Sequence, residues 1–276
     1  MANGAEATPY AALGPTAFWR SAVANRGAFG LRDLCVPRFP IDRGMGIATQ
    51  GSCFAQHIGR ALTQRGFRWL EAEPPIAAFS KTVNAAHNYG VFTFRTGNIY
   101  TPRLFAQWLE WASGAAAPPP EVWSKGERFV DPFRPTIEPE GFADEAGVLA
   151  ARERTLQAIA AMLPRIDVFI FTLGQTEAWQ TRDGTIYPLC PGTAGGTFDP
   201  AQHQLVNADV VSVVADMERA HRQLKRHNPD MKLLLTVSPV PMVATASGEH
   251  VMVANARTKS VLGAAADALC TRHSDV

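Results

Sequence analysis

Cysteine is scarce in this chain, and its few cysteines lie far apart. No Cys-x-x-Cys pair occurs among Cys35, Cys53, Cys190 and Cys270. Structural zinc sites usually draw on closely spaced ligand pairs, and small secreted domains rely on dense disulfide frameworks. The sequence therefore predicts neither a zinc site nor a disulfide framework, and we expect free thiols in a reducing compartment.

Long apolar runs and an excess of one charge are also missing. No segment approaches the roughly 18 consecutive apolar residues of a membrane span, and the first residues lack the basic start and apolar run of a secretory signal. The formal net charge is +1 and no basic cluster occurs, so neither nucleic acid nor an acidic surface is expected as a partner. These absences predict a soluble cytoplasmic protein without a membrane span.

Motifs for cofactors and metals are absent as well. The glycines at 192, 195 and 196 do not form a dinucleotide or phosphate-loop fingerprint. No His-x-x-x-His pair occurs, and acidic residues and histidines are scattered along the chain. The sequence therefore predicts no cofactor and no metal.

Apolar residues, by contrast, make up 46% of the chain and follow an alternation of helix and strand patterns. Helical spacing predicts helices over 145–162, 210–227 and 251–270, and a helix that starts behind Thr101 and Pro102. The nearly all-apolar runs 167–172 and 232–237 are typical of buried parallel strands, and 67–70 indicates a shorter one. This alternation predicts an α/β fold, a three-layer α/β/α sandwich with a mostly parallel central sheet.

Two regions depart from this alternation. Residues 1–44 are expected to form an extended amino-terminal arm, with a short helix around 17–24, that packs on a single α/β domain over 45–276. Within the domain, residues 114–141 are rich in Pro, Gly and Ala and indicate an irregular, lid-like loop. Its aromatic residues either line a pocket or, in the favoured interpretation, hold the loop against the domain.

The domain is organised around residues 45–64, where a strand pattern ends at Gly51 and helical spacing begins at Phe54. Ser52 therefore lies in a turn at the carboxyl edge of a sheet, beside the free N–H groups of a new helix. A serine there can attack an ester carbonyl while backbone donors stabilise the oxyanion. On this pattern alone, capping the helix is the commoner role. Cys53 is a rival nucleophile, but its side chain is expected to point into the core.

Several ordered blocks of the chain resemble the GSCFA family. They are Gly-Ser-Cys-Phe-Ala at 51–55, and residues 89–101, 172–179, 190–193 and 236–241, the last leading to His250 and Asn255. That family is similar to the SGNH (GDSL-like) hydrolases, whose flavodoxin-like sheet carries a serine after its first strand. The resemblance implies this fold, with Ser52 as the nucleophile, and names no substrate.

The resemblance also suggests how an oxyanion would be held. In SGNH hydrolases the donors are a backbone N–H at the serine, a glycine N–H and an asparagine side chain. These roles carry over onto the backbone N–H of Cys53 and onto Gly174, but Thr176 stands where the asparagine is expected. Gln175 and Thr176 are therefore candidate donors or substrate contacts. Asn207 is a further candidate donor, although an asparagine in such a position is more often a turn residue.

The general base is the missing component. SGNH enzymes carry Asp-x-x-His near the carboxyl terminus, beyond a further strand. This sequence contains no Asp-x-x-His, and its last residues, Asp275 and Val276, resemble the start of that further strand. Either the chain lacks a carboxyl-terminal segment, or another histidine acts, or the protein is not catalytic. His250 is the best internal substitute, although a lone histidine is more often structural. Glu177 either orients the base or contacts substrate, or it meets a helix amino terminus.

These patterns predict a serine-dependent esterase or O-acyltransferase that forms an acyl-enzyme at Ser52. The substrate would carry an O-acyl group, such as acetyl, on a carbohydrate or a small ester. The alternative is a catalytically degenerate SGNH-fold protein that binds a glycan or another ligand. The sequence decides neither between hydrolysis and transfer nor on the oligomeric state.

Overall fold

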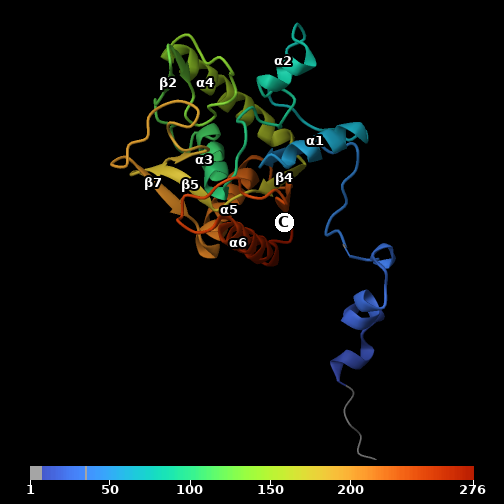
Figure 1. Ribbon diagram of the computed structural model, residues 1–276. Helices are drawn as coiled ribbons and strands as arrows, with labels where there is room; N and C mark the ends of the chain where they lie inside the picture. Colours follow the sequence, from blue (N-terminus) through green and yellow to red (C-terminus); the bar gives the residue numbers. More distant parts are fainter. Residues whose placement is uncertain (1–7, 35) are drawn as a thin grey trace, which may run out of the picture. The chain divides into compact units, whose positions relative to one another are not determined.

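The computed structural model describes residues 8–34 and 36–276 (Figure 1), and the chain divides into two compact units, 1–40 and 41–276. The described part of the first unit contains short 3-10 turns and one π-helix, Arg20–Ala24, where a helix was expected around 17–24. None of its described residues is buried. The packing of this arm on the domain stays a prediction.

The second unit is an α/β domain built on a parallel sheet in the order β1-β4-β8. The strands are β1 (Ile47–Gly51), β4 (Val168–Leu173) and β8 (Lys232–Val237). All six residues of β4 are buried between its two neighbours, as its unbroken apolar run predicts. The two long strand predictions are therefore confirmed to within one residue.

The strand expected over 67–70 is reduced to a single bridge. Trp69 pairs with Ile47 in parallel at the free edge of β1. Two residues further along β1, the N–H of Thr93 donates to Thr49 O at 3.1 Å, and Thr49 N–H donates to Thr93 Oγ1 at 2.9 Å. Because Thr93 occupies the edge of β1 there, the segment around Trp69 cannot extend its pairing.

The predicted helices over 145–162 and 210–227 are confirmed at both ends. They begin behind Asp144 and Asp209, whose side chains accept hydrogen bonds from the backbone N–H groups of Gly147 and Ser212. In the described part of the chain, no helix combines the length and apolar character needed to cross a membrane. The α-helices are α1 (Ala55–Gln64), α2 (Lys81–Ala86), α3 (Pro102–Ala112), α4 (Glu145–Met162), α5 (Val210–His227) and α6 (Val251–Arg272) (Figure 1).

Helices contact both faces of the sheet. On one face, Phe105 of α3 stacks on Phe171 of β4, with ring centroids 4.1 Å apart and an interplanar angle of 11°. On the other face, a Cβ added at Gly59 of α1 would lie 3.1 Å from the Thr49 hydroxyl oxygen. Thr49 is paired with Ile170, which alternates with Phe171 along the strands. The close approach at Gly59 therefore seats α1 on the face opposite α3.

Regions that the sequence left as loops contain short antiparallel strands. Directly after β4 the chain forms a second sheet in the order β6-β5-β7. The segment 114–141 contains an antiparallel hairpin of β2 and β3. These additional strands are β2 (Trp123–Lys125), β3 (Arg128–Val130), β5 (Glu177–Thr181), β6 (Ile186–Tyr187) and β7 (His203–Asn207).

A buried charge cluster holds the segment 114–141 against the domain. Asp131 is fully buried and pairs with Arg134 and with Arg152 of α4, each at 2.9 Å. The aromatic side chains of Trp123 and Phe133 are buried beside it. Buried ion pairs with several hydrogen bonds tolerate little displacement, because breaking one leaves an unpaired charge.

The exit from β1 depends on Gly51. Its φ is +132°, a conformation that favours glycine, and a Cβ at this position would lie 2.3 Å from the Thr172 carbonyl oxygen of β4. The next residue, Ser52, donates its backbone N–H to that same oxygen at 3.1 Å. Gly51 therefore lets the chain turn out of the sheet while it remains against β4.

We expect Gly51→Ala to lower the free energy of unfolding by roughly 3 kcal/mol or more, because the added methyl meets backbone in an unfavourable φ region. Gly66→Ala is the matched control: its φ is +73°, but no atom lies within 4 Å of the added Cβ, so it should cost roughly 1 kcal/mol. Urea unfolding of both variants measures the difference. Equal losses would contradict a special constraint at Gly51.

Candidate functional site

The carboxyl ends of the three parallel strands meet at one cavity. Ser52 follows β1, Gly174 follows β4 and Ser238 follows β8, and all three line a cavity of about 80 Å³. Residues 240–243, which belong to the connection between β8 and α6, also line this cavity. The expectation that the strand-end residues come together is confirmed, and a cavity of this size holds a group of only a few heavy atoms.

The Ser52 hydroxyl lies in the cavity wall without a hydrogen-bond partner. The residue is 2% exposed, and its Oγ is buried and unpaired in the described chain. Helix α1 begins only at Ala55, and its N-cap residue, Phe54, makes no side-chain capping bond. Ser52 therefore does not cap the helix. Burying a hydroxyl without a partner is unfavourable, so this oxygen keeps a hydrogen-bonding capacity that the described chain does not use.

Two hydrogen-bond donors beside Ser52 are unoccupied. Within the described residues, neither the backbone N–H of Cys53 nor the side-chain amide of Gln175 makes a hydrogen bond, and both residues line the cavity. The backbone N–H groups of Gly174 and Gln175 both donate to Tyr100 O at 3.0 Å. Of the predicted oxyanion donors, the Cys53 N–H and the Gln175 amide are thus free, and the Gly174 N–H is engaged.

The expectation that the Cys53 side chain points into the core is wrong. Cys53 is half-buried and lines the same cavity as Ser52. It lies in the turn between β1 and α1, where the alternation of faces along a strand no longer applies. Its thiol interacts electrostatically with Tyr100 and with Lys259 of α6, so it lies at the strand ends and not in the core.

Lys259 is a site residue that the sequence did not reveal. It comes from α6, is half-buried, and donates from Nζ to the carbonyl oxygen of Gly174 at 2.9 Å. Burial lowers the pKa of Lys259, and interaction with Cys53 opposes this by raising it. Burial likewise raises the pKa of Tyr100, which lines the cavity. Nothing in the spacing of α6 distinguishes Lys259 from a surface lysine.

Thr176 and Asn207 face a neighbouring cavity. The Thr176 hydroxyl donates to Asn207 Oδ1 at 2.7 Å and contacts the Thr258 hydroxyl at 3.0 Å, and Arg257 donates to the same Asn207 oxygen. Both residues line a cavity of about 270 Å³ but not the one at Ser52. The structure therefore does not bring them together with the serine.

Glu177 begins a strand, so the expected helix amino terminus at this residue is wrong. It is the first residue of β5, because the chain turns directly into the second sheet. Its carboxylate accepts hydrogen bonds from the Thr245 hydroxyl at 2.6 Å and from the Ala246 N–H at 3.3 Å. Glu177 also lines a cavity of about 400 Å³ that shares Tyr100, Gln175 and Val243 with the cavity at Ser52.

His250 lies outside the cavity at Ser52. It is exposed, it is the N-cap residue of α6, and its Nδ1 accepts the backbone N–H of Met252 at 3.2 Å. In the described chain, no histidine lines this cavity. A basic side chain that does contact a strand-end residue is Lys259, through Gly174 O.

The chain belongs to the GSCFA family, whose family model matches residues 46–276. The match begins at the residue before β1 and covers the whole sheet and all three strand ends. No curated protein matches the chain, and no solved structure matches it.

The contacts of Glu177 predict how the connection between β8 and α6, which lines the cavity, is held in place. Glu177→Ala removes both acceptors for residues 245–246, so amide hydrogen exchange over 243–249 should accelerate about tenfold or more, the effect of losing a charge-assisted hydrogen bond. Glu140→Ala, at an exposed acid in the segment 114–141, is the control and should leave this exchange unchanged. Unaltered exchange in Glu177→Ala would show that other contacts hold the segment.

Proposed function

We propose that this protein is a serine-dependent esterase or O-acyltransferase that forms an acyl-enzyme at Ser52. The observation that carries the proposal is the buried, unpaired Ser52 hydroxyl in a strand-end cavity, beside the free N–H of Cys53. A nucleophile and an oxyanion donor must converge on one point, and these two atoms come from adjacent residues of one turn.

The arrangement of the sheet supports an SGNH-type, three-layer α/β/α sandwich. Helices α1 and α3 contact opposite faces. The bridge at Trp69 lies beyond β1, and at the other edge the Leu233 N–H of β8 donates to Asp275 O at 2.9 Å. If the segments at Trp69 and Asp275 are counted as strands, the five strands, numbered along the chain, lie in the order 2-1-3-4-5. This is the order of a flavodoxin-like doubly wound sheet, which binds ligands at the carboxyl ends of its strands.

In the proposed mechanism, Lys259 accepts the proton of the nucleophile. Lys259 Nζ donates to Gly174 O, and a Cβ added at Gly174 would lie 3.0 Å from Ser52 Cβ, so Gly174 is the residue that connects the amine to the serine. Burial favours the neutral amine, which can act as a base. Lysine replaces histidine as the base in some serine hydrolases.

The bonds then change as in other acyl transfers. Ser52 Oγ bonds to the carbonyl carbon as its proton passes to Lys259, while the oxyanion accepts from the Cys53 N–H and the Gln175 amide. The ester bond breaks, and Lys259 returns the proton to the leaving oxygen. Water or an acceptor hydroxyl then attacks the acyl carbon as Lys259 takes its proton, the bond from that carbon to Ser52 Oγ breaks, and Lys259 returns the proton to Ser52 Oγ.

The cavities favour a small acyl group on a larger polar carrier. The 80 Å³ space at Ser52 suits acetyl, whereas the adjoining 400 Å³ cavity suits a sugar-sized carrier. Trp179, Tyr187 and Glu177 line the larger cavity and offer aromatic faces and a carboxylate that accepts hydroxyl donors. We therefore propose an O-acetylated carbohydrate as the substrate.

The competing candidate is a ligand-binding protein that has lost catalysis. It is favoured by the exposure of His250 and by the absence of histidine from the lining of the cavity within the described chain. Covalent labelling distinguishes the two candidates. A fluorophosphonate should modify Ser52 if that oxygen is an activated nucleophile, and a pure binding protein should stay unlabelled.

Ser52→Ala should reduce hydrolysis of an activated acetyl ester by at least about 10³-fold with the fold intact, because the acyl acceptor is removed. Circular dichroism checks the fold. Cys53→Ala keeps the backbone N–H and should retain at least about a tenth of the activity. Loss of activity in Cys53→Ala together with full activity in Ser52→Ala would show that the Cys53 thiol is the nucleophile.

Lys259→Met should lower kcat by about 10²–10⁴-fold, as expected for removal of a general base. In the native protein the rate should rise with pH as Lys259 loses its proton, with a midpoint below the usual pKa of lysine, because burial lowers the pKa of Lys259. The variant should lose this rise. Lys81→Met, at an exposed position on α2, is the control; an unchanged pH profile in Lys259→Met would exclude Lys259 as the base.

A further inference from the structure

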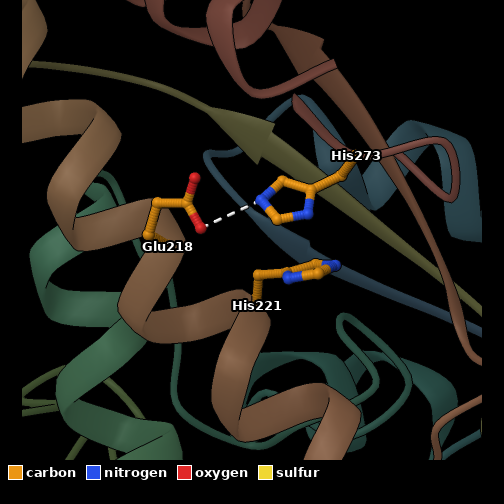
Figure 2. A group of neighbouring side chains, drawn as sticks. All are labelled: Glu218, His221 and His273. Carbon is orange, nitrogen blue, oxygen red and sulfur yellow. Dashed lines mark hydrogen bonds and ion pairs between the residues drawn. The ribbon is translucent and has the colours of Figure 1, made fainter. Parts of the chain in front are cut away.

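A second group of chemically active side chains lies away from the Ser52 cavity. Glu218 and His221 are one turn apart on α5, and His273 directly follows α6. One ligand atom from each of the three residues lies within 4.8 Å of the other two. Figure 2 shows that the three side chains converge from two segments that are far apart in sequence.

The present contacts orient the two imidazoles. His273 Nε2 lies 2.9 Å from Glu218 Oε2, and the rings of His221 and His273 are 4.3 Å apart at their centroids. His221 Nε2 lies 3.3 Å from Asp275 Oδ2, and the same carboxylate oxygen is 2.6 Å from Lys225 Nζ. Histidines that bind a metal usually bond a carboxylate through the other ring nitrogen. Asp275 can fix His221 in this way and leave Nδ1 for an ion.

We propose that Glu218, His221 and His273 form a binding site for a divalent transition-metal ion, Zn²⁺ above all. Two imidazoles and one carboxylate are an established zinc ligand set, which a water completes. Ligand atoms of a tetrahedral zinc lie roughly 3.3 Å apart, so the site needs a modest contraction. The ion would take the place of the hydrogen bond between Glu218 and His273.

The surrounding charges decide which metals fit. Two cations balance the negative charges of Glu218 and Asp275. Arg272 Nη1 lies 3.5 Å from Glu218 Oε1, and Lys225 Nζ pairs with Asp275 Oδ2. The site is therefore not an acidic cluster that attracts any cation. Mg²⁺ and Ca²⁺ prefer sites made of oxygen ligands, whereas the two imidazole nitrogens favour Zn²⁺.

The position of the site separates it from the proposed acyl chemistry. Asp275 O bonds to Leu233 at the beginning of β8, whereas Ser52 follows the end of β1. Because β1, β4 and β8 are parallel, these are opposite ends of the sheet. A zinc ion here would join α5 to the residues after α6 and would not contact an ester bound at Ser52.

The test uses the whole chain, freed of metal with a chelator and then titrated with Zn²⁺. We expect one zinc per chain by isothermal titration and elemental analysis. The unfolding temperature should rise by roughly 5 °C or more at a hundredfold excess over Kd. Co²⁺ in place of Zn²⁺ should give the intense visible absorption of a tetrahedral site. Mg²⁺ should produce none of these effects.

Variants locate the ion. His221→Ala and His273→Ala should each weaken zinc binding at least tenfold, and Glu218→Gln, which retains the shape, covers the case in which a histidine variant fails to fold. His57→Ala, at an exposed histidine of α1, and Ser52→Ala should bind zinc normally. Absence of stoichiometric zinc in the native chain, or unchanged binding in His273→Ala and Glu218→Gln, would overturn the proposal.

Discussion

The contact between Gly51 and the Thr172 carbonyl is the constraint on which the candidate site depends. A side chain at position 51 would collide with β4, so only glycine lets β1 stay in register to its end and then turn. The turn that follows fixes the backbone of Ser52 by a hydrogen bond to the same carbonyl. The hydroxyl and the Cys53 N–H thereby inherit the rigidity of the sheet, which a site on a long loop would lack.

The second constraint is the cover over the strand ends. The connection between β8 and α6 is held at two points, by Glu177 at residues 245–246 and by Asn255, which accepts the Met242 N–H at 3.1 Å. Lys259 and Tyr100 are partly buried at the strand ends, and burial shifts the pKa of each toward its neutral form. The hydrogen bonds of Glu177 and Asn255 therefore hold the segment that lines the cavity, while burial acts on the pKa of the groups beside it.

Much of the sheet and its helices could be predicted from the sequence, because their signals are local. The runs at β4 and β8 and the capped starts of α4 and α5 carry their own pattern. The second sheet could not be predicted in this way, since the buried residues of β5 are polar, β7 has no buried residue, and neither strand alternates strictly. At the site, Ser52 was found by its place after β1. Lys259 was missed because its role depends on α6 folding back onto Gly174, which no local spacing encodes.

Helix α6 links the two ends of the sheet. Its N-cap region adjoins the cover, Lys259 reaches the strand ends near its middle, and His273 lies just beyond its last turn. Fourteen positions separate Lys259 from His273, roughly 20 Å along a helix. The Lys259 contact with Gly174 O and the His273 contact with Glu218 Oε2 therefore hold α6 at two points, one near its middle and one just beyond its last turn. The two clusters are thus attached to one helix but have separate partners and separate chemistry.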